Sequence, residues 1–333
     1  MSEKEKRRAP WVLFGTVAAC SLALGFAVDR QFFTQSTDPS SSEVCAQKYP
    51  LLRSDLDCTS VNDDYARVTS IQDDLDTYIE QQKTDGNIRR VSVFFRDLSS
   101  RRWAAANKDE QYAPGSMLKV VLAIAYYKLA EIEPQILSQE YTYSPTQKSM
   151  NDMETFKPND KLVTGNKYSV ETLIGHMIKD SDNDAATLLG DSIDMVFLNK
   201  VFSDLNIHLP KQGGSEQNFI TAERMSSVIR SLYQASYLDA DNSQKLLTLM
   251  SQTSFSEGIV AGVASSTPVA HKFGEREVID AKSQKKVSSE LHDCGIVYKG
   301  THPYILCVMT EGSSYDTQTK VLSGISRLVF DNE

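Results

Sequence analysis

The spacing of apolar residues along the chain changes from helical to strand-like and back. In "VTSIQDDLDTYIEQQ", Val68, Ile71, Leu75 and Ile79 recur every three or four residues, which predicts a helix. The next runs, "RRVSVFFRDL" and "RRWAAAN", are rich in aromatic, β-branched and small apolar residues and predict two strands joined by a short polar turn. A further apolar run predicts a helix over about residues 116–131.

The middle of the chain has helical spacing, and its last third returns to strands before a closing helix. The helical segments are "SVETLIGHMIKD", "NDAATLLGDSI", "MVFLNKVFSDL", "TAERMSSVIRSLYQASY", "NSQKLLTLMSQT" and "DTQTKVLSGISRLVF", and the strand segments are "PVAHKFG", "HDCGIVY" and "YILCVMT". Strands near both ends indicate an α+β (layered α/β) fold with an antiparallel sheet built from both termini, flanked by helices, plus an all-helical lobe. We place this domain at residues 65–333.

The N-terminal residues have the pattern of a membrane anchor. A basic tail, residues 1–10, precedes the uncharged run "WVLFGTVAACSLALGFAV" at residues 11–28. As a helix this run is about 27 Å long, close to the hydrocarbon thickness of about 30 Å. The basic tail favours a cytoplasmic N-terminus. We therefore expect a single-pass cell-membrane protein with a linker (29–64) and a catalytic domain outside the cytoplasm.

Three alternatives for this segment remain open. "GFA" is compatible with signal-peptide cleavage after Ala27. "VAAC" resembles a lipoprotein site with Cys20 as the lipidated residue, although the chain stays apolar after it. A buried helix of a soluble protein is the third.

Charge and motif content exclude several functional classes. A formal net charge of -9 and a pI of about 5.2 argue against a nucleic-acid partner. The chain contains no GxxxxGK[ST], GxGxxG or HExxH motif. Its five histidines lack the spacing of metal ligands, so we expect no metal and no cofactor.

The cysteines outside the apolar run fit an oxidising compartment. Cys294 and Cys307 lie in two strand-like runs separated by "KGTH", and a four-residue hairpin loop there would place them directly opposite each other. We predict a disulfide at this position; the alternative is a pair of buried thiols packed as small hydrophobes. Cys45–Cys58 is a second predicted bridge, in the linker.

The first chemical signal is "SMLK", in which Lys119 follows Ser116 at the start of an apolar helix. Residues three apart share a helix face, so the lysine nitrogen can reach the serine hydroxyl. Desolvation would lower the pKa of the lysine and let it act as a base for that hydroxyl. The alternative is a helix N-cap with a lysine extending to solvent. Since the same spacing recurs at Ser283 and Lys286 in a polar stretch, the motif alone proves nothing.

The second signal is "SDN", formed by Ser181, Asp182 and Asn183 between two helical runs. A hydroxyl and an amide on one turn can transfer a proton and hold an amide group. The alternatives are a turn with a helix cap, and a calcium loop over "DSDNDAATLLGD". The calcium loop lacks the glycine and the final glutamate that an EF-hand needs.

The third signal is "HKFG" on a predicted strand, with Lys272 two residues before Gly274. A glycine lets a ligand backbone approach, and the ammonium can meet a carboxylate. The alternative is an edge strand with an exposed lysine. Lys211 and Gly213 match the same loose pattern in a loop-like stretch.

Together and in this order, the three signals resemble the Ser-x-x-Lys, Ser-Asp-Asn and Lys-Thr-Gly signature of class A β-lactamases and penicillin-binding proteins. The resemblance covers the chain from about residue 68 to its end. It implies that Ser116 is the acylated nucleophile and Lys119 its base. It also implies that Ser181 transfers a proton and that Asn183 binds the side-chain amide of the substrate.

The resemblance gives the third segment two roles. Lys272 would attract the substrate carboxylate and keep the pKa of Lys119 low. The backbone N–H groups of Ser116 and of Glu275, the residue after Gly274, would form the oxyanion hole.

Two features depart from the family. The Glu-x-x-Leu-Asn loop that class A β-lactamases use for deacylation is missing, and Glu216 is the remaining acid there that would have to replace it. Phe273 stands where the family has a threonine or serine hydroxyl that contacts the substrate carboxylate, so substrate choice differs or activity is reduced.

These observations predict a membrane-anchored extracytoplasmic serine hydrolase or acyltransferase acting on a peptide-like donor, such as a D-alanyl cell-wall peptide or a β-lactam. The alternatives are a β-lactamase that turns over continuously and a non-catalytic domain that binds a wall fragment or a protein partner.

Overall fold

The computed structural model describes residues 61–100, 102–145, 148–210, 218–280 and 282–333. Residues Asn62–Glu333 form one compact unit. Within the described ranges, no helix combines the length and the apolar character needed to cross a bilayer. The predicted membrane segment (11–28) and the predicted Cys45–Cys58 bridge lie outside the described residues.

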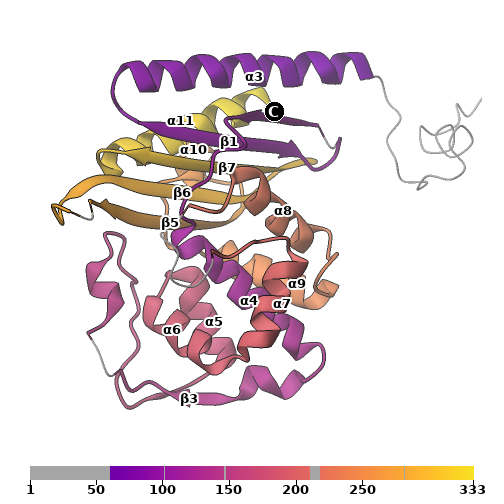
Figure 1. Cartoon of the computed structure of the whole chain (residues 1–333). Helices are drawn as coiled ribbons and strands as arrows, with labels where there is room; N and C mark the ends of the chain where they lie inside the picture. The colour runs from indigo at the N-terminus through magenta and orange to yellow at the C-terminus, as the bar shows by residue number, and fades with distance from the viewer. Residues whose placement is uncertain (1–60, 101, 146–147, 211–217, 281) are drawn as a thin grey trace, which may run out of the picture. The chain divides into compact units, whose positions relative to one another are not determined.

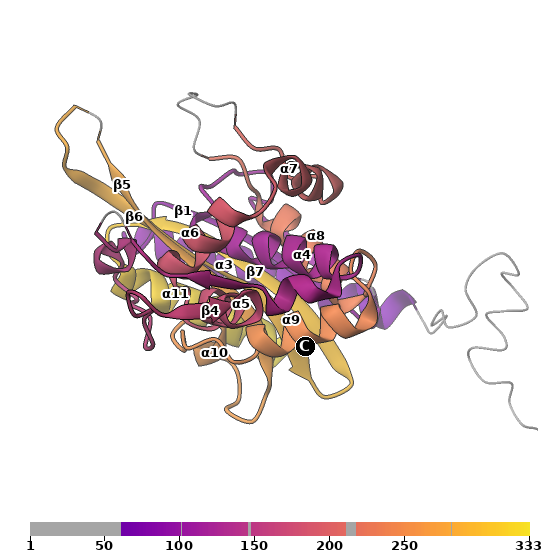
Figure 2. The ribbon, with the colours of Figure 1, turned by 90° about the horizontal axis from the view of Figure 1, so that it is seen from below.

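One antiparallel sheet runs through the unit, and its strands come from both ends of the chain (Figure 1). Its spatial order is β2-β1-β7-β6-β5. The strands are β1 (Arg90–Asp97), β2 (Trp103–Ala106), β5 (Val269–Ile279), β6 (Lys286–Lys299) and β7 (His302–Gly312). This confirms the predicted α+β sheet built from both termini. The β5–β6 hairpin extends beyond the other strands (Figure 2).

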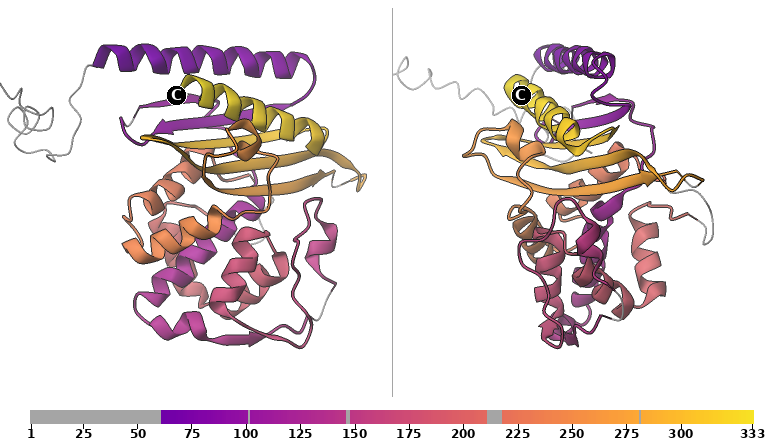
Figure 3. Two further views of the ribbon diagram at one scale, coloured as in Figure 1. Left: turned by 180° about the vertical axis from the view of Figure 1, so that it is seen from behind. Right: turned by 90° about the vertical axis from the view of Figure 1, so that its left-hand side faces the viewer.

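Helices cover both faces of the sheet, as the edge-on view in Figure 3 shows. On one face lie α3 (Val61–Thr84), α10 (Ile259–Gly262) and α11 (Tyr315–Asn332). The lobe on the other face contains α4 (Lys119–Ala130), α5 (Val170–Lys179), α6 (Asn183–Ser192), α7 (Met195–Asp204), α8 (Ala222–Tyr233) and α9 (Ala240–Met250). The predicted helices are present in these two layers.

The hydrophobic core has two parts, one on each side of the sheet. Ile71, Leu75 and Ile79 of α3 are buried against the sheet on one side, as their helical spacing predicted. On the other side the buried residues of α4 and α5 pack among the helices of the lobe and against the sheet. Because side chains of adjacent strand residues point to opposite faces, each strand contributes to both parts.

Several short elements were missed by the sequence analysis. They are the 3₁₀ helices η1 (Gly115–Leu118), η2 (Pro134–Ser138) and η3 (Met150–Met153), the strands β3 (Glu140–Thr142) and β4 (Lys167–Ser169), and the short helix α10. The helix expected over residues 116–131 therefore begins with a 3₁₀ turn. Three to five residues carry too little periodicity to be recognised as a helix or strand.

The β6–β7 hairpin has the predicted register. Tyr298 pairs with Pro303, Cys294 pairs with Cys307, and a disulfide joins the two cysteines. The loop is shorter than predicted, because Lys299 also pairs with His302. Gly300 has φ 54°, a left-handed conformation that glycine adopts without steric cost and that this tight turn uses.

Candidate active site

The 3₁₀ turn η1 carries Ser116 to the edge of the sheet. Gly115 precedes it with φ 51°, and a Cβ atom there would lie 2.9 Å from the carbonyl oxygen of Glu275. A Cβ atom on Gly274 would lie 2.7 Å from the carbonyl oxygen of Pro114. Only glycine at these two positions lets η1 and β5 come so close, which brings the backbone of Ser116 beside that of Glu275.

Lys119 is the first residue of α4 and is 7% exposed. Its Nζ donates to the carbonyl and hydroxyl oxygens of Ser181, the latter at 3.2 Å, and to Oδ1 of Asn183 at 2.6 Å. Burial lowers the pKa of Lys119 to about 8, although nearby carboxylates, Glu154 first among them, act in the opposite direction. The lysine is therefore desolvated, as a base for serine must be.

Ser181 lies in the turn between α5 and α6 with φ 56°, a left-handed conformation that is uncommon for serine. The next residue, Asp182, caps α6 by accepting hydrogen bonds from the backbone N–H of Asp184 and Ala185. The alternative interpretation of this turn as a helix cap is therefore correct for Asp182. The same turn directs the Ser181 hydroxyl toward Lys119 and places Asn183 at the first position of α6.

Lys272 of β5 reaches the same turn from the sheet. It is fully buried, and its Nζ donates to the Ser181 hydroxyl at 2.9 Å and to the Phe273 carbonyl at 2.9 Å. Burial lowers its pKa well below the usual range, and the neighbouring Lys119 ammonium lowers it further. The alternative of an edge strand with an exposed lysine is correct for the strand, since β5 is the last strand of the sheet, and wrong for the lysine, which is buried.

Phe273 does not line the pocket around Ser116. It is 2% exposed, stacks on Phe255 with ring centroids 4.4 Å apart, and packs against Phe156 at 5.8 Å. The Lys272 ammonium lies 4.2 Å from the centre of the Phe273 ring. The family's threonine or serine provides a hydroxyl for the substrate carboxylate. Phe273 provides none, and its ring instead covers the Lys272 ammonium.

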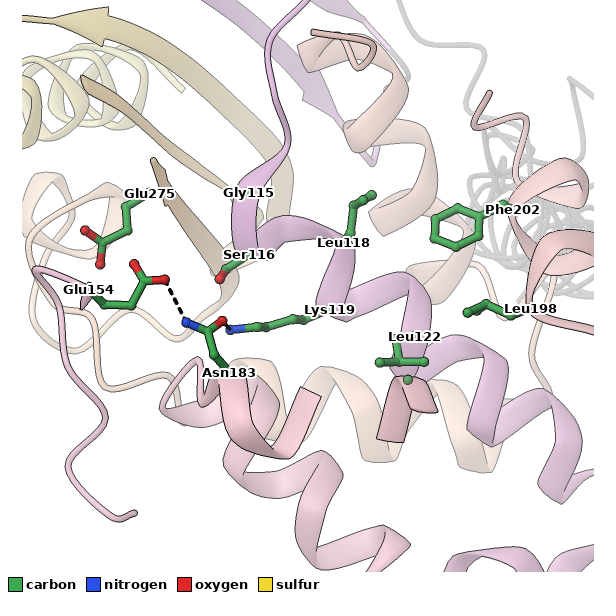
Figure 4. Close-up of a pocket in the computed structure, with 11 residues that line it drawn as sticks. Gly115, Ser116, Leu118, Lys119, Leu122, Glu154, Asn183, Leu198, Phe202 and Glu275 are labelled. Atoms are coloured by element: carbon green, nitrogen blue, oxygen red, sulfur yellow. Dashed lines mark hydrogen bonds between the residues drawn. The ribbon is translucent and has the colours of Figure 1, made fainter. Parts of the chain in front are cut away.

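A pocket of about 370 Å³ contains the Ser116 side chain (Figure 4). In this view Glu154 and Glu275 lie together on one side of Ser116, and Leu198 and Phe202 of α7 lie on the other. The pocket is lined by Gly115, Ser116, Leu118, Lys119, Leu122, Glu154, Asn183, Gly190, Leu198, Phe202 and Glu275. It thus combines an acidic end with an apolar end.

Glu154 is a pocket residue that the sequence analysis missed. Its carboxylate accepts a hydrogen bond from Nδ2 of Asn183 at 2.7 Å. Glu275, predicted only for its backbone N–H, also lines the pocket with its side chain. Burial, with a smaller contribution from Glu154, raises the pKa of Glu275 to about 7. The segment "NDMETF" has no motif or residue spacing that indicates a site. Glu154 reaches Asn183 only because its loop lies against the start of α6 in the folded protein.

The structure brings five predicted site residues together: Ser116, Lys119, Ser181, Asn183 and Lys272. Gly274 and Glu275 adjoin them on β5. Two other predicted or alternative sites, Glu216 and the pair Lys211 and Gly213, lie outside the described residues. Asp184, part of the calcium-loop alternative, accepts hydrogen bonds from Tyr143, Ser149 and Asn151 instead.

Comparison with known proteins identifies similar sequences and folds. The model of the beta-lactamase enzyme family matches residues 70–332. A search of curated protein sequences finds no match.

Solved structures with a similar fold include a mutant of PBP-A in an acyl-enzyme complex with penicillin G, with 18% identity, TM-score 0.63 and coverage of 79% of this chain and 96% of that one. An ancestral class A β-lactamase has 19% identity, TM-score 0.64 and coverage of 79% and 100%. A β-lactamase from Burkholderia phymatum has 17% identity, TM-score 0.65 and coverage of 80% and 99%.

Proposed function

Because the chain belongs to the beta-lactamase enzyme family, we propose that it forms an acyl-enzyme on Ser116 with a peptide-like donor, such as a D-alanyl cell-wall peptide or a β-lactam. Membership makes it a serine hydrolase of the β-lactamase and D,D-peptidase superfamily. The observation that carries the proposal is that Ser181 accepts hydrogen bonds from two buried lysines beside the pocket of Ser116.

The contacts support the following order of proton transfers. Lys119, once neutral, takes the proton of the Ser116 hydroxyl as that oxygen attacks the donor carbonyl. All three N–H bonds of Lys119 point to Ser181 and Asn183, so deprotonation must release one of them before the nitrogen can accept. The Ser181 hydroxyl, held by Lys119 and Lys272, then passes a proton to the leaving group.

The developing negative charge on the donor carbonyl oxygen requires hydrogen-bond donors. The backbone N–H groups of Ser116 and Glu275 are the candidates, because the close approach of η1 and β5 brings these two segments together. Removing one such donor typically costs about 10²–10³ in rate.

A β-lactamase with continuous turnover is the second candidate, favoured by the fold shared with class A β-lactamases. It requires a base that activates water against the acyl-enzyme. Among the described pocket residues the acids are Glu154 and Glu275, both already engaged in hydrogen bonds. Slow hydrolysis of the acyl-enzyme is therefore the expectation.

We also propose that residues 11–28 anchor the protein in the cell membrane with the catalytic domain on the extracytoplasmic side. The uncharged apolar run and the preceding basic residues support this.

One experiment tests the acyl-enzyme and separates the candidates. The full chain, purified in detergent, is incubated with a fluorescent penicillin and with a thioester donor, and its intact mass is followed over time, with Ser116→Ala as the control. A persistent adduct that needs Ser116 supports the leading proposal. A transient adduct with continuing penicillin consumption supports the β-lactamase. No adduct with either donor would leave only a binding role.

A further inference from the structure

The acidic end of the pocket occupies the place where the family resemblance puts the acyl side chain of the substrate. Asn183 is the residue expected to donate to that side-chain amide. In this structure its Nδ2 donates to the carboxylate of Glu154 instead, at 2.7 Å (Figure 4). Oδ1 of the same amide accepts from Lys119 at 2.6 Å. Both polar atoms of Asn183 therefore have partners within the protein.

The segment that carries Glu154 is fixed in place by Glu275. Both carboxylate oxygens of Glu275 accept backbone N–H groups from this segment, that of Thr155 at 3.1 Å and that of Phe156 at 2.8 Å. Hydrogen bonds of backbone N–H groups to a carboxylate are charge-assisted and hold the chain firmly. Glu275 thus acts as a positioning residue for Glu154.

An aromatic cluster holds the same segment from the other side. The ring of Phe156 packs edge-on against Phe255, with centroids 4.9 Å apart, and against Phe273 and Tyr315, each at 5.8 Å. Phe273, the residue that departs from the family, is therefore one of the side chains that pack against this segment and hold it in place. The Glu154 carboxylate is consequently part of the wall of the pocket.

The pocket also has no positive group available for a substrate anion among its described residues. The N–H bonds of Lys119 are directed to Ser181 and Asn183. Those of Lys272 go to the Ser181 hydroxyl and the Phe273 carbonyl, and the Phe273 ring covers the ammonium at 4.2 Å. A donor carboxylate would have to displace one of these contacts.

Charged groups on α4, on β5 and at the start of α6 lie near Glu154. Lys119 of α4 and Lys272 of β5 interact with it, and both have pKa values lowered by burial. The carboxylates of Asp182, Asp184 and Glu275 act on Lys119 together with Glu154. At pH 7 Lys119 is mostly charged and Glu275 is about half ionised, whereas the lowered pKa of Lys272 favours its neutral form. Together with the carboxylates of Glu154, Asp182 and Asp184 this leaves a negative local potential, which favours a cation.

We propose that Glu154 is a specificity-determining residue that selects acyl donors carrying a free ammonium group on the acyl side, in place of an N-acylated amide. The proposal rests on the acylation of Ser116 proposed above. The ammonium would sit against the Glu154 carboxylate, next to Asn183, in a charge-assisted hydrogen bond. A neutral amide gains less at this carboxylate, and an anionic group is repelled.

Three thioesters of 2-mercaptoethanol with the same glycyl carbonyl and different groups on the glycyl nitrogen test this at pH 7: glycyl (ammonium), N-acetylglycyl (neutral) and N-succinylglycyl (anionic). In each reaction the Ser116 oxygen forms an ester with the glycyl carbonyl carbon and the C–S bond breaks. The thiol leaves with the proton that came from Ser116. Thiol release gives kcat/KM, and intact mass confirms the adduct on the full chain.

We expect kcat/KM for the glycyl donor to exceed that for N-acetylglycyl about tenfold, with N-succinylglycyl lowest. Glu154→Gln should lower kcat/KM for the glycyl donor about tenfold and raise that for the N-acetylglycyl donor, so that the order of the two donors reverses.

Glu275→Gln should weaken the preference for the glycyl donor mainly through KM, because it loosens the segment that carries Glu154. Glu277→Gln, an exposed glutamate two residues further along β5, should leave the preference unchanged.

The outcomes distinguish this inference from the function on which it rests. If all three thioesters acylate Ser116 at similar rates, or if Glu154→Gln keeps the wild-type order, the ammonium preference is wrong while the acyl-enzyme stands. If no thioester and no penicillin acylates Ser116, both proposals are wrong.

Discussion

The ammonium of Lys272 donates to the hydroxyl of Ser181 across 2.9 Å, although 91 residues separate them in the sequence. The same hydroxyl accepts from Lys119 at 3.2 Å. Two ammonium groups bound to one oxygen repel each other, and this repulsion adds to burial in lowering the pKa of Lys272. This is how a buried site obtains a neutral amine.

Replacing Ser181 with alanine should slow acylation of Ser116 by about 10²–10⁴, the range that proton transfer by a positioned group contributes. The substitution removes the hydroxyl that accepts from both lysines and that, in the proposed mechanism, passes a proton to the leaving group. The measurement is the rate of adduct formation by rapid quench and intact mass.

Ser226→Ala is the matched control for this change. Ser226 is also buried, on α8, and its hydroxyl has no hydrogen-bond partner within the described part of the chain. Its replacement should leave acylation within about twofold of the wild type. A Ser181→Ala rate equally close to the wild type would remove Ser181 from the proton path.

Acylation should depend on pH through Lys119, whose pKa is lowered by burial to about 8. The base is the neutral amine, so below pH 8 its fraction, and with it kcat/KM, rises about tenfold per pH unit. Above pH 8 the rate should level off. The pH profile of kcat/KM for the N-acetylglycyl thioester, which does not titrate in this range, measures it.

Lys119→Arg should abolish this pH dependence together with the activity, because a guanidinium does not lose its proton in proteins. Lys128→Arg is the control on the same helix, since Lys128 forms a surface ion pair with Glu131 at 2.6 Å. A flat profile in the wild type would show that Lys119 is not the titrating base.

Stability should fall as the pH rises through the titration of Glu275. Burial and the neighbouring Glu154 raise its pKa from 4.5 to about 7. Below pH 4.5 the residue is protonated in both states, whereas between 4.5 and 7 only the folded state keeps the proton. The contribution of Glu275 to the free energy of unfolding therefore decreases across this window and is lost above pH 7, while buried His292, whose pKa is lowered to about 4, acts in the opposite direction between pH 4 and 6.5.

Urea unfolding at pH 5, 6 and 8 measures this slope. In Glu275→Gln the slope should be smaller, because glutamine does not titrate, while part remains from Glu290, whose pKa burial also raises to about 7. Glu277→Gln, at an exposed position, should keep the wild-type slope. An unchanged slope in Glu275→Gln would mean that Glu275 titrates normally.

Phe273→Thr, which restores the family residue, should destabilise the protein rather than improve carboxylate binding. The Phe273 ring is 2% exposed and stacks on Phe255, so its loss leaves a cavity that costs roughly 3 kcal/mol. The free energy of unfolding by urea is the measurement, and Phe273→Leu should cost less because it fills more of the space. A stable threonine variant with faster N-succinylglycyl turnover would show that the hydroxyl reaches the pocket.

Replacing both Cys294 and Cys307 with alanine should lower the free energy of unfolding by up to about 3 kcal/mol, because the closed loop of 13 residues restricts the unfolded chain. The melting temperature measures the loss. A reducing agent should lower the melting temperature of the wild type and leave that of the double variant unchanged. No response of the wild type to reduction would show that the bridge contributes no stability.

The sequence by itself determined the longer helices and strands and the pairing of the last hairpin. Helical spacing fixed the buried face of α3 through Ile71, Leu75 and Ile79, and the symmetry of the β6–β7 hairpin fixed Cys294 opposite Cys307. These are local properties, in which the period of side chains or the length of one turn decides the outcome. The closeness of Ser116 and Lys119, the proposed nucleophile and base, is local in the same way, because only three positions separate them.

Only the tertiary structure decided which residues surround Ser116 and Lys119. The Glu154 carboxylate meets Asn183 from 29 positions earlier in the chain, and Glu275 holds the backbone of Phe156 from 119 positions away. Phe273 was expected to change contact with a substrate, but the fold turns it into an aromatic cluster and over the Lys272 ammonium. Such contacts join segments that lie far apart in the sequence. Their distance in space depends on how the loops and the edge strand pack on the core, so no residue spacing predicts them.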